Sequence, residues 1–240
     1  MNERYSRQIA FYGIGEHGQR KLGGARAAIV GLGALGTAAA DRLCRAGISY
    51  LRLIDDDEVE LSNIQRQSLY TMADVGSKKA ETSAARLREI NPEIKIEPLV
   101  TRLTKAGDEM ISGVDLVLDC TDNAAARYLI NETCHRFGLP WVHGAAAGSG
   151  GAVFAIVPGG ACFRCLYPDT VAASSGGTAE TYGMLNTLTA IVGALEANEA
   201  LKIILGKPVC GLLMLDVWNG VFEYIDARRD PDCPVCGGIR

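Results

Sequence analysis

Three glycines, Gly31, Gly33 and Gly36, follow the short apolar run 27–30 at G-x-G-x-x-G spacing. A glycine turn of this kind lets the backbone approach a phosphate closely and directs it to a helix N-terminus. Asp55 follows about twenty residues later, where a carboxylate can bind ribose hydroxyls. The pattern therefore predicts a nucleotide site. The alternative is a glycine turn kept only for tight packing of a helix on a sheet.

The polar segment after Asp55 bears on which nucleotide is bound. Residues 62–67 read Ser-Asn-Ile-Gln-Arg-Gln, which places Arg66 and several amides where they can reach phosphates. An arginine on a triphosphate suits nucleotidyl transfer better than hydride transfer. Lys78 and Lys79 then begin a predicted helix, where the helix dipole disfavours cations. A nearby anionic ligand would explain at least one of these lysines.

Asp122 and Asn123 directly follow a predicted buried strand at 115–120. In an open parallel sheet, ligands bind outside the carboxyl ends of the strands. We therefore expect Asp122 on the same rim as the glycines and Asp55. The alternative is that Asp122 and Asn123 only cap the helix predicted over 124–137, and the two roles are compatible.

Four of the eight cysteines form two Cys-x-x-Cys pairs, Cys162 with Cys165 and Cys233 with Cys236. Two such pairs can hold Zn²⁺ in a tetrahedral thiolate site, but the long gap between them does not itself specify the pairing. Redox dithiols and free thiols are the alternatives, although a redox pair usually opens a helix after a strand. We predict a structural zinc knuckle whose four protein ligands leave no open position for catalysis.

The other cysteines and the histidines carry no pattern of partners. We expect small buried hydrophobic residues at the cysteines and ordinary side chains at the histidines. These residues are Cys44, Cys120, Cys134 and Cys210, and His17, His135 and His143.

The elements that must position these residues alternate along the chain. Apolar runs predict strands at 27–30, 50–54, 94–100, 115–120, 140–143, 152–157, 212–217 and 221–225. Helical patterns cover 34–45, 78–90, 124–137 and 183–205, the last apolar enough to be buried or to lie at a subunit interface. Residues 144–151 predict close backbone contacts or a mobile turn, and residues 169–182 predict a flexible loop. The order favours an α/β fold with a Rossmann-like open, mostly parallel sheet and C-terminal antiparallel strands.

Length and composition limit the remaining choices. The chain has 240 residues, 48% of them hydrophobic, and a net charge of −4, which fits one domain. Within it we expect an N-terminal arm at 1–24, a nucleotide-binding core at 25–160 and a zinc-pinned part at 161–240. No basic run suggests nucleic acid or an anionic membrane surface. No signal peptide or membrane-spanning run is evident, so we expect a cytoplasmic protein.

In this order the motifs resemble the ThiF/MoeB (HesA/MoeB/ThiF) family, relatives of the ubiquitin-activating enzymes, over nearly the whole chain. The resemblance rests on residues 4–8, 31–36, 62–67 and 119–123, on Asp55 and Lys79, and on both cysteine pairs. It implies ATP-dependent adenylation of the C-terminal Gly-Gly carboxylate of a ubiquitin-like sulfur-carrier protein, ThiS-like or MoaD-like. The product would be an acyl adenylate for sulfur transfer in thiamin, molybdopterin or related biosynthesis.

The resemblance also implies roles for single residues. Asp55 resembles the ribose ligand, and Asp122 resembles the Mg²⁺ ligand, with Asn123 beside the nucleotide. Arg7 resembles an arginine supplied by the other subunit of a homodimer, which implies two composite sites. The phosphate ligands would be Asn63, Arg66 and Lys79, and the rest of the nucleotide site Gly31, Gly33, Ala34, Gly36, Asp57, Ser62, Ile64 and Gln65.

The chain departs from the family pattern at two places. Position 34 is alanine where the family often has glycine, a change that a helix start tolerates. Some members also carry a cysteine in the loop before the long helix, where this chain has Thr178 and Ala179. We therefore predict that the protein stops at the adenylate and leaves sulfur chemistry to a cysteine desulfurase or a rhodanese. Cys210 is a remote candidate for a covalent role.

Other functions stay open on the residues alone. An NAD-dependent oxidoreductase would use the same glycine turn, but Arg66, Lys79 and Asp122 argue against hydride transfer. A relative that activates a small carboxylate or a tRNA is a third reading, and a non-catalytic scaffold is a fourth.

Overall fold

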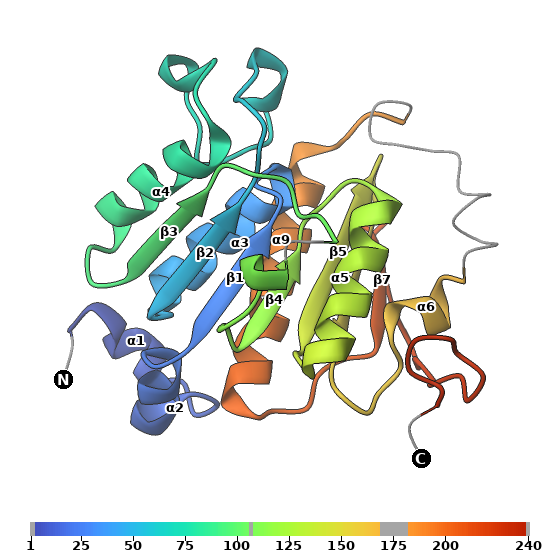
Figure 1. The fold of residues 1–240 in the computed structure, drawn as a ribbon. Helices are drawn as coiled ribbons and strands as arrows, with labels where there is room; N and C mark the ends of the chain where they lie inside the picture. The colour runs from blue at the N-terminus through green and yellow to red at the C-terminus, as the bar shows by residue number, and fades with distance from the viewer. Residues whose placement is uncertain (1–2, 106–107, 169–181, 239–240) are drawn as a thin grey trace.

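The computed structural model describes residues 3–105, 108–168 and 182–238, and these form one sheet of eight strands in the order β3-β2-β1-β4-β5-β6-β7-β8 (Figure 1). Strands β1 to β5 pair in parallel, whereas β6, β7 and β8 are antiparallel. This confirms the predicted fold class. The strands are β1 Arg26–Val30, β2 Tyr50–Ile54, β3 Lys95–Leu99, β4 Leu116–Asp119, β5 Trp141–Ala147, β6 Gly150–Ile156, β7 Leu212–Asp216 and β8 Val221–Ile225.

Helices cover both faces of the sheet. The side chains of α3, α4 and α9 pack into one core cluster, and those of α5 and α6 pack into another on the opposite face. The longer helices are α2 Gly15–Leu22, α3 Ala34–Ala46, α4 Lys79–Ile90, α5 Ala124–Phe137 and α9 Asn186–Leu205, and the short ones are α1 Ser6–Ile9 and α6 Phe163–Leu166. Single 3₁₀ turns lie at Glu3–Tyr5, Leu61–Asn63, Met72–Asp74 and Asp108–Met110.

The central strands and α9 are buried, as their largely apolar composition predicts. All four residues of β4 are buried, as expected for a parallel strand covered on both faces. Helix α9 lies against α3 so closely that a Cβ at Gly193 would sit 2.7 Å from the Cβ of Ala38. Much of the apolar surface of α9 is therefore buried inside this chain, although Ile191 stays exposed.

Of the two predictions for segment 144–151, the structure agrees with close contacts and not with a mobile turn. Strand β5 continues through Gly144 to Ala147, and β6 begins at Gly150. The small residues are needed because α9 lies against them: a Cβ at Gly144 would be 2.2 Å from Cδ of Glu196, and a Cβ at Gly151 would be 2.7 Å from Cγ2 of Val192. They serve close packing within a strand pair.

The N-terminal arm wraps over its own domain. Gln8 and Gln19 both donate to the carbonyl of Ala46 at the end of α3, and a Cβ at Gly47 would lie 2.6 Å from the Tyr5 ring. Among the described residues no helix has the length and apolar character needed to cross a bilayer. The predicted core at 25–160 and part at 161–240 both contribute strands to the sheet, and the single-domain assignment stays a prediction.

Candidate active site

The glycine turn joins β1 to α3 and is packed tightly at two of its three glycines. Gly31 has φ +90°, and a Cβ there would lie 2.7 Å from the carbonyl oxygen of Cys120. A Cβ at Gly36 would lie 1.9 Å from the carbonyl oxygen of Gly31. These glycines let α3 start against β1 and β4, so that the free N–H groups of its first turn face the rim of the sheet.

Asp55 is fixed against this turn by two backbone hydrogen bonds. Its Oδ2 accepts from the Leu32 amide at 2.6 Å, and its Oδ1 accepts from the Asp57 amide at 2.8 Å. Burial raises the pKa of Asp55, while both amides and nearby Lys79 oppose that rise. The carboxylate is thus preoriented beside the glycine turn, as ribose recognition requires.

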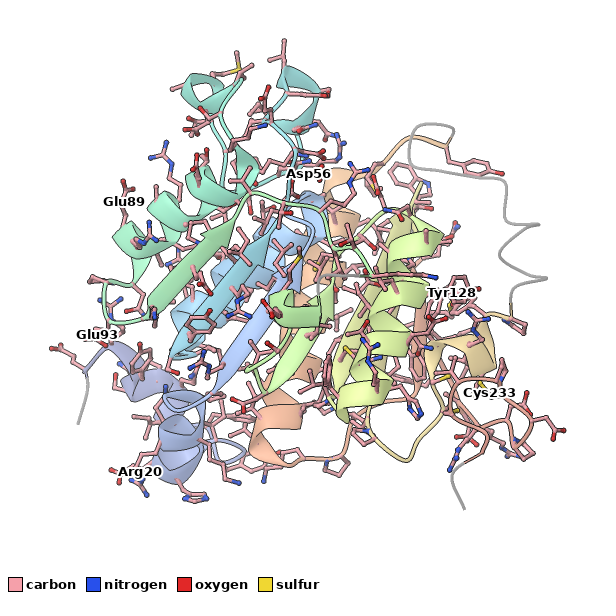
Figure 2. All side chains as sticks on the ribbon, viewed as in Figure 1. Arg20, Asp56, Glu89, Glu93, Tyr128 and Cys233 are labelled. Carbon is pink, nitrogen blue, oxygen red and sulfur yellow. The ribbon has the colours of Figure 1, made fainter. Side chains whose placement is uncertain are left out.

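Lys79 brings a buried cation to the same place. It is 7% exposed, and its Nζ lies 3.0 Å from Oδ2 of Asp57, while its backbone amide donates to the Asp57 carbonyl. Figure 2 marks neighbouring Asp56 at this end of the sheet. A nearly buried ammonium at the start of α4 needs an anionic partner. Asp57 supplies one, and a phosphate could supply another.

The segment 62–67 folds back on itself above the glycine turn. Arg66 donates from Nη1 to the Ser62 carbonyl at 2.8 Å, and the buried Asn63 accepts at Oδ1 from the Glu60 amide. The chain then reaches Tyr70, whose hydroxyl donates to the Leu32 carbonyl at 2.9 Å. This bond ties the segment to the turn. Ile64 packs against the core, whereas Ser62 and Gln65 are exposed.

Asp122 and Asn123 lie at the end of β4, beside the glycine turn. Asn123 caps α5 by accepting the Ala126 amide at Oδ1, at 2.9 Å, so the predicted capping role is confirmed for Asn123. Asp122 is exposed, and among the residues that the structure describes it forms no ion pair. An exposed carboxylate without a cation of its own has ligand positions free for Mg²⁺.

His143 is not the ordinary residue that we predicted. Its Nδ1 lies 2.8 Å from Oδ2 of Asp119, and both side chains are almost completely buried. Asp119 and His143 are register partners of β4 and β5. Burial lowers the pKa of His143 against the opposing effect of Asp119, so the ring is neutral near pH 7. The register of the two parallel strands places both side chains on one face, and no local sequence signal indicated that register.

A second buried acid lies close by. Glu196 of α9 is fully buried, and its Oε1 lies 3.4 Å from Sγ of Cys120. Burial and the nearby Asp119 raise the pKa of Glu196 well above its usual range. Cys44, Cys120 and Cys134 are buried as predicted, whereas Cys210 is only partly buried, with its Sγ 3.3 Å from Nζ of Lys202.

Arg7 lies at the other end of the molecule. Its neighbour Tyr5 packs at the C-terminus of α3, whereas the glycine turn is at the N-terminus of that helix. A helix of this length spans about 20 Å. Figures 1 and 2 show α1 and α2, with Arg20, at the opposite end of the sheet from Asp56. Arg7 is exposed there, so it is not brought together with the site of its own chain.

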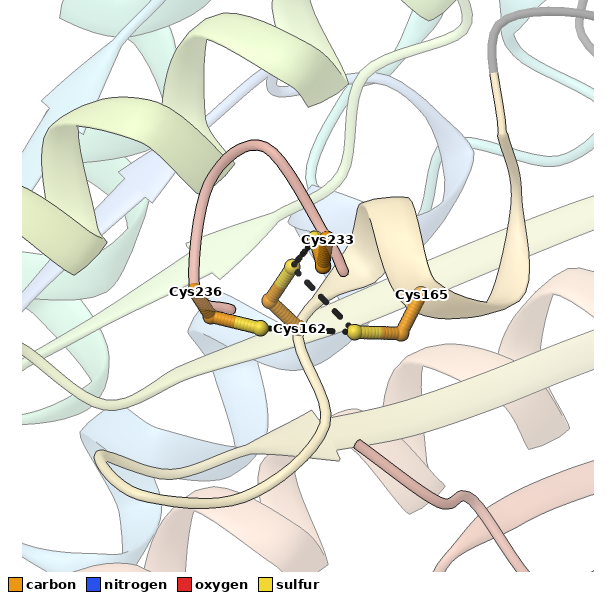
Figure 3. A group of neighbouring side chains, drawn as sticks. All are labelled: Cys162, Cys165, Cys233 and Cys236. Carbon is orange, nitrogen blue, oxygen red and sulfur yellow. Dashed lines mark hydrogen bonds between the residues drawn. The ribbon is translucent and has the colours of Figure 1, made fainter. Parts of the chain in front are cut away.

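The four paired cysteines converge on one point (Figure 3). Their sulfur atoms all lie within 4.8 Å of one another, with separations of 3.4 Å for Cys165–Cys236, 3.6 Å for Cys162–Cys233 and 3.8 Å for Cys162–Cys165. A tetrahedron of Zn–S bonds of about 2.3 Å has edges of roughly 3.8 Å. The donor set and its spacing therefore fit zinc.

The local electrostatics of the knuckle differ between its cysteines. Burial raises the pKa of Cys162. Burial also acts to raise the pKa of Cys233, but hydrogen bonds from the amides of Cys236 and Val235 outweigh it and lower that pKa to about 7. A metal ligand must be the thiolate, and Cys233 is already inclined to that form.

Comparison with known proteins agrees with this geometry. The model of the ThiF family matches residues 5–235. Similar curated proteins are a SAMP-activating enzyme E1 of Haloferax volcanii (41% identity, 98% of this chain and 88% of the relative) and a sulfur carrier protein ThiS adenylyltransferase of Escherichia coli (40%, 98% and 95%). A molybdopterin-synthase adenylyltransferase of Escherichia coli is 40% identical over 98% of this chain and 96% of the relative.

Proposed function

This chain belongs to the ThiF family, and from that premise we propose that it is an ATP-dependent adenylyltransferase acting on a small ubiquitin-like sulfur carrier. The carboxylate activated is the C-terminal Gly-Gly carboxylate of the carrier, ThiS-like or MoaD-like. The similar proteins include a sulfur carrier protein ThiS adenylyltransferase and a molybdopterin-synthase adenylyltransferase, which supports this reaction. The observation that carries the proposal is the preoriented Asp55 carboxylate and the buried Lys79 cation around one glycine turn.

In the proposed complex, ATP lies across the glycine turn. Asp55 accepts from the ribose hydroxyls, and the first turn of α3 donates to the phosphates. Asn63, Arg66 and Lys79 supply the remaining phosphate contacts, with Arg66 leaving the Ser62 carbonyl to reach them. The partly exposed position of Arg66 supports such a swing, because only one hydrogen bond to its own loop is lost.

Mg²⁺ would be held by Asp122, whose exposed carboxylate supports that role, and would offset phosphate charge when bound. Asn123 remains the cap of α5 and holds the loop that presents Asp122. The residues of this chain do the positioning, which is the main source of catalysis in such a transfer.

The reaction itself is a displacement at phosphorus. A carboxylate oxygen of the carrier attacks the α-phosphorus of ATP, a new P–O bond forms, and the bond to the β-phosphate breaks. Pyrophosphate leaves with its electron pair, and the carrier ends as an acyl adenylate. Cations around the phosphates stabilise the charge on the leaving group.

We further propose that the protein is a homodimer in which Arg7 of each chain completes the site of the other. The distance between Arg7 and its own glycine turn supports this arrangement. The cysteine knuckle would hold a structural zinc ion that ties the segment around Cys233 to the core. Thr178 and Ala179 lie outside the described residues. Their lack of a thiol supports a reaction that ends at the adenylate, with a cysteine desulfurase or rhodanese acting afterwards.

The test is ATP–pyrophosphate exchange with purified protein and a carrier that ends in Gly-Gly. We expect exchange that requires both Mg²⁺ and the carrier, with no exchange when the final glycine is deleted. Nicotinamide nucleotides should give neither binding nor hydride transfer. Exchange that ignores the carrier tail, or uptake of NAD in place of ATP, would contradict the proposal.

A further inference from the structure

Gln67 closes the segment 62–67, and its side chain is buried without a partner for its oxygen. The residue is 4% exposed, and Oε1 accepts no hydrogen bond from any residue that the structure describes. Its backbone, in contrast, is satisfied: the amide donates to the Asn63 carbonyl, and the carbonyl accepts from the Tyr70 amide. A buried amide without a partner is destabilising, so its position needs another reason.

The amide of Gln67 points at Gly33, the one glycine of the turn that packing does not require. Of the described atoms outside the turn, only Nε2 of Gln67 comes within 4 Å of a Cβ placed at Gly33, at 3.8 Å. Gly31 and Gly36 are crowded by backbone, whereas Gly33 opens onto space. Gly33 is also the N-cap of α3, and no side chain caps that helix.

From this juxtaposition we infer that Gln67 is a further nucleotide-binding residue, beyond those already assigned to the site. Its side-chain amide binds the sugar–phosphate part of ATP at the point where the nucleotide passes over Gly33. The side chain turns toward the bound nucleotide, so that Nε2 donates to a phosphate oxygen beside the N-terminus of α3 and Oε1, buried in the absence of ligand, accepts from a ribose hydroxyl. The inference rests on the proposed function, because it takes ATP as the ligand.

The geometry supports this role over a purely structural one. A structural glutamine satisfies its amide within the protein, as Gln19 does by donating to the Ala46 carbonyl at 3.0 Å and accepting from Gln8 at 2.7 Å. Gln67 instead keeps an unpaired oxygen in a segment fixed to the turn through Tyr70. Binding of ATP would supply the missing partner.

Three variants separate these roles by titration calorimetry with ATP and Mg²⁺ and by urea unfolding without nucleotide. Gln67→Met removes both polar atoms at similar length, and we expect the Kd for ATP to rise about 10-fold or more. Its urea midpoint without nucleotide should equal or exceed that of the wild type, because an unpaired amide oxygen is gone.

Gln67→Glu places a negative charge beside phosphate and should weaken the binding of ATP more than Gln67→Met does. The matched control Gln19→Met should do the opposite, lowering the urea midpoint while leaving the Kd for ATP unchanged.

Each other outcome rejects the inference. Wild-type affinity in Gln67→Met would remove the contact with the nucleotide. A urea midpoint that falls as it does in Gln19→Met would show that the amide has a structural partner. Tighter ATP binding by Gln67→Glu than by Gln67→Met would exclude donation to phosphate. A wild-type protein that binds no ATP would instead reject the proposed function, and this inference with it.

Discussion

The carboxylate of Asp119 connects the ring of His143 to the loop that carries Asp122. Oδ2 of Asp119 lies 2.8 Å from Nδ1 of His143. Oδ1 accepts from both the amide and the hydroxyl of Thr121, at 3.1 Å and 2.6 Å. Thr121, the second residue after β4, is therefore held by the buried pair of Asp119 and His143. The proposed magnesium ligand is placed by groups that do not touch the nucleotide.

The buried, neutral His143 should make stability depend on pH. Its folded pKa is lowered, so the unfolded chain binds the proton first as the pH falls. The free energy of unfolding should therefore decrease below about pH 6.5, by up to about 1.4 kcal/mol per pH unit. The measurement is urea unfolding from pH 5 to 8 for wild type and His143→Gln, which lacks this component. Parallel curves for the two proteins would contradict the neutral, buried ring.

Glu196 should make the stability of the protein depend on pH in the opposite direction. Burial raises its folded pKa far above that of the unfolded chain, so its contribution is fully present below about pH 4.3 and is lost as the pH rises through the folded pKa. Glu196→Gln, which cannot ionise, should gain stability relative to wild type with increasing pH. Thermal unfolding at pH 5 and pH 8 measures this gain. A difference that stays the same at both pH values would argue against a buried acid.

Arg66→Ala and Asp122→Ala should each abolish ATP–pyrophosphate exchange while leaving the fold intact. Both side chains lie at the surface of the site, and neither forms an ion pair among the described residues. Their loss should therefore change the free energy of unfolding by less than about 1 kcal/mol. Exchange assays and urea unfolding check the two halves of this prediction. Retained exchange in both variants would remove these residues from the site.

Mixing two inactive variants tests whether Arg7 acts across a subunit interface. Arg7→Ala and Asp122→Ala should each be inactive alone. After subunit exchange, half of the dimers are mixed, and each mixed dimer holds one intact site. Activity should then recover to about a quarter of the wild-type value. No recovery, with mixed dimers verified by mass spectrometry, would place Arg7 outside the partner's site.

Replacing one knuckle cysteine should remove metal and lower stability. Cys236→Ser breaks a closed set of four thiolates, and structural zinc contributes directly to folding. We expect bound zinc to be lost and the melting temperature to fall, whereas Cys210→Ser, outside the knuckle, should keep its zinc. Elemental analysis and calorimetry provide the measurements. Loss of activity in Cys236→Ser with zinc still bound would mean that the knuckle is not only structural.

Much of the site followed from local chemistry. Gly31, Gly36 and Asp55 lie within one strand–turn–helix–strand unit, so their spacing alone predicted the turn and the acid beside it. The convergence of two cysteine pairs separated by 71 residues agrees with the predicted four-thiolate site, although the spacing alone did not specify that pairing.

What the sequence did not predict depends on distant packing. For Gly144 the sequence left a close contact and a turn equally open, and only Glu196 of α9, facing it, explains why a strand needs glycine there. Likewise, the pairing of His143 with Asp119 depends on the register of β4 with β5. That register is set by the whole sheet rather than by neighbouring residues.

The knuckle also bears on how the chain reaches its native state. Helix α9 and strands β7 and β8 all lie between Cys165 and Cys233. If the thiols capture zinc while the chain is still open, that segment becomes a closed loop with fewer conformations to search. Refolding should then run faster when zinc is supplied at the start than when it is added late, so the metal would guide assembly as well as hold the finished protein.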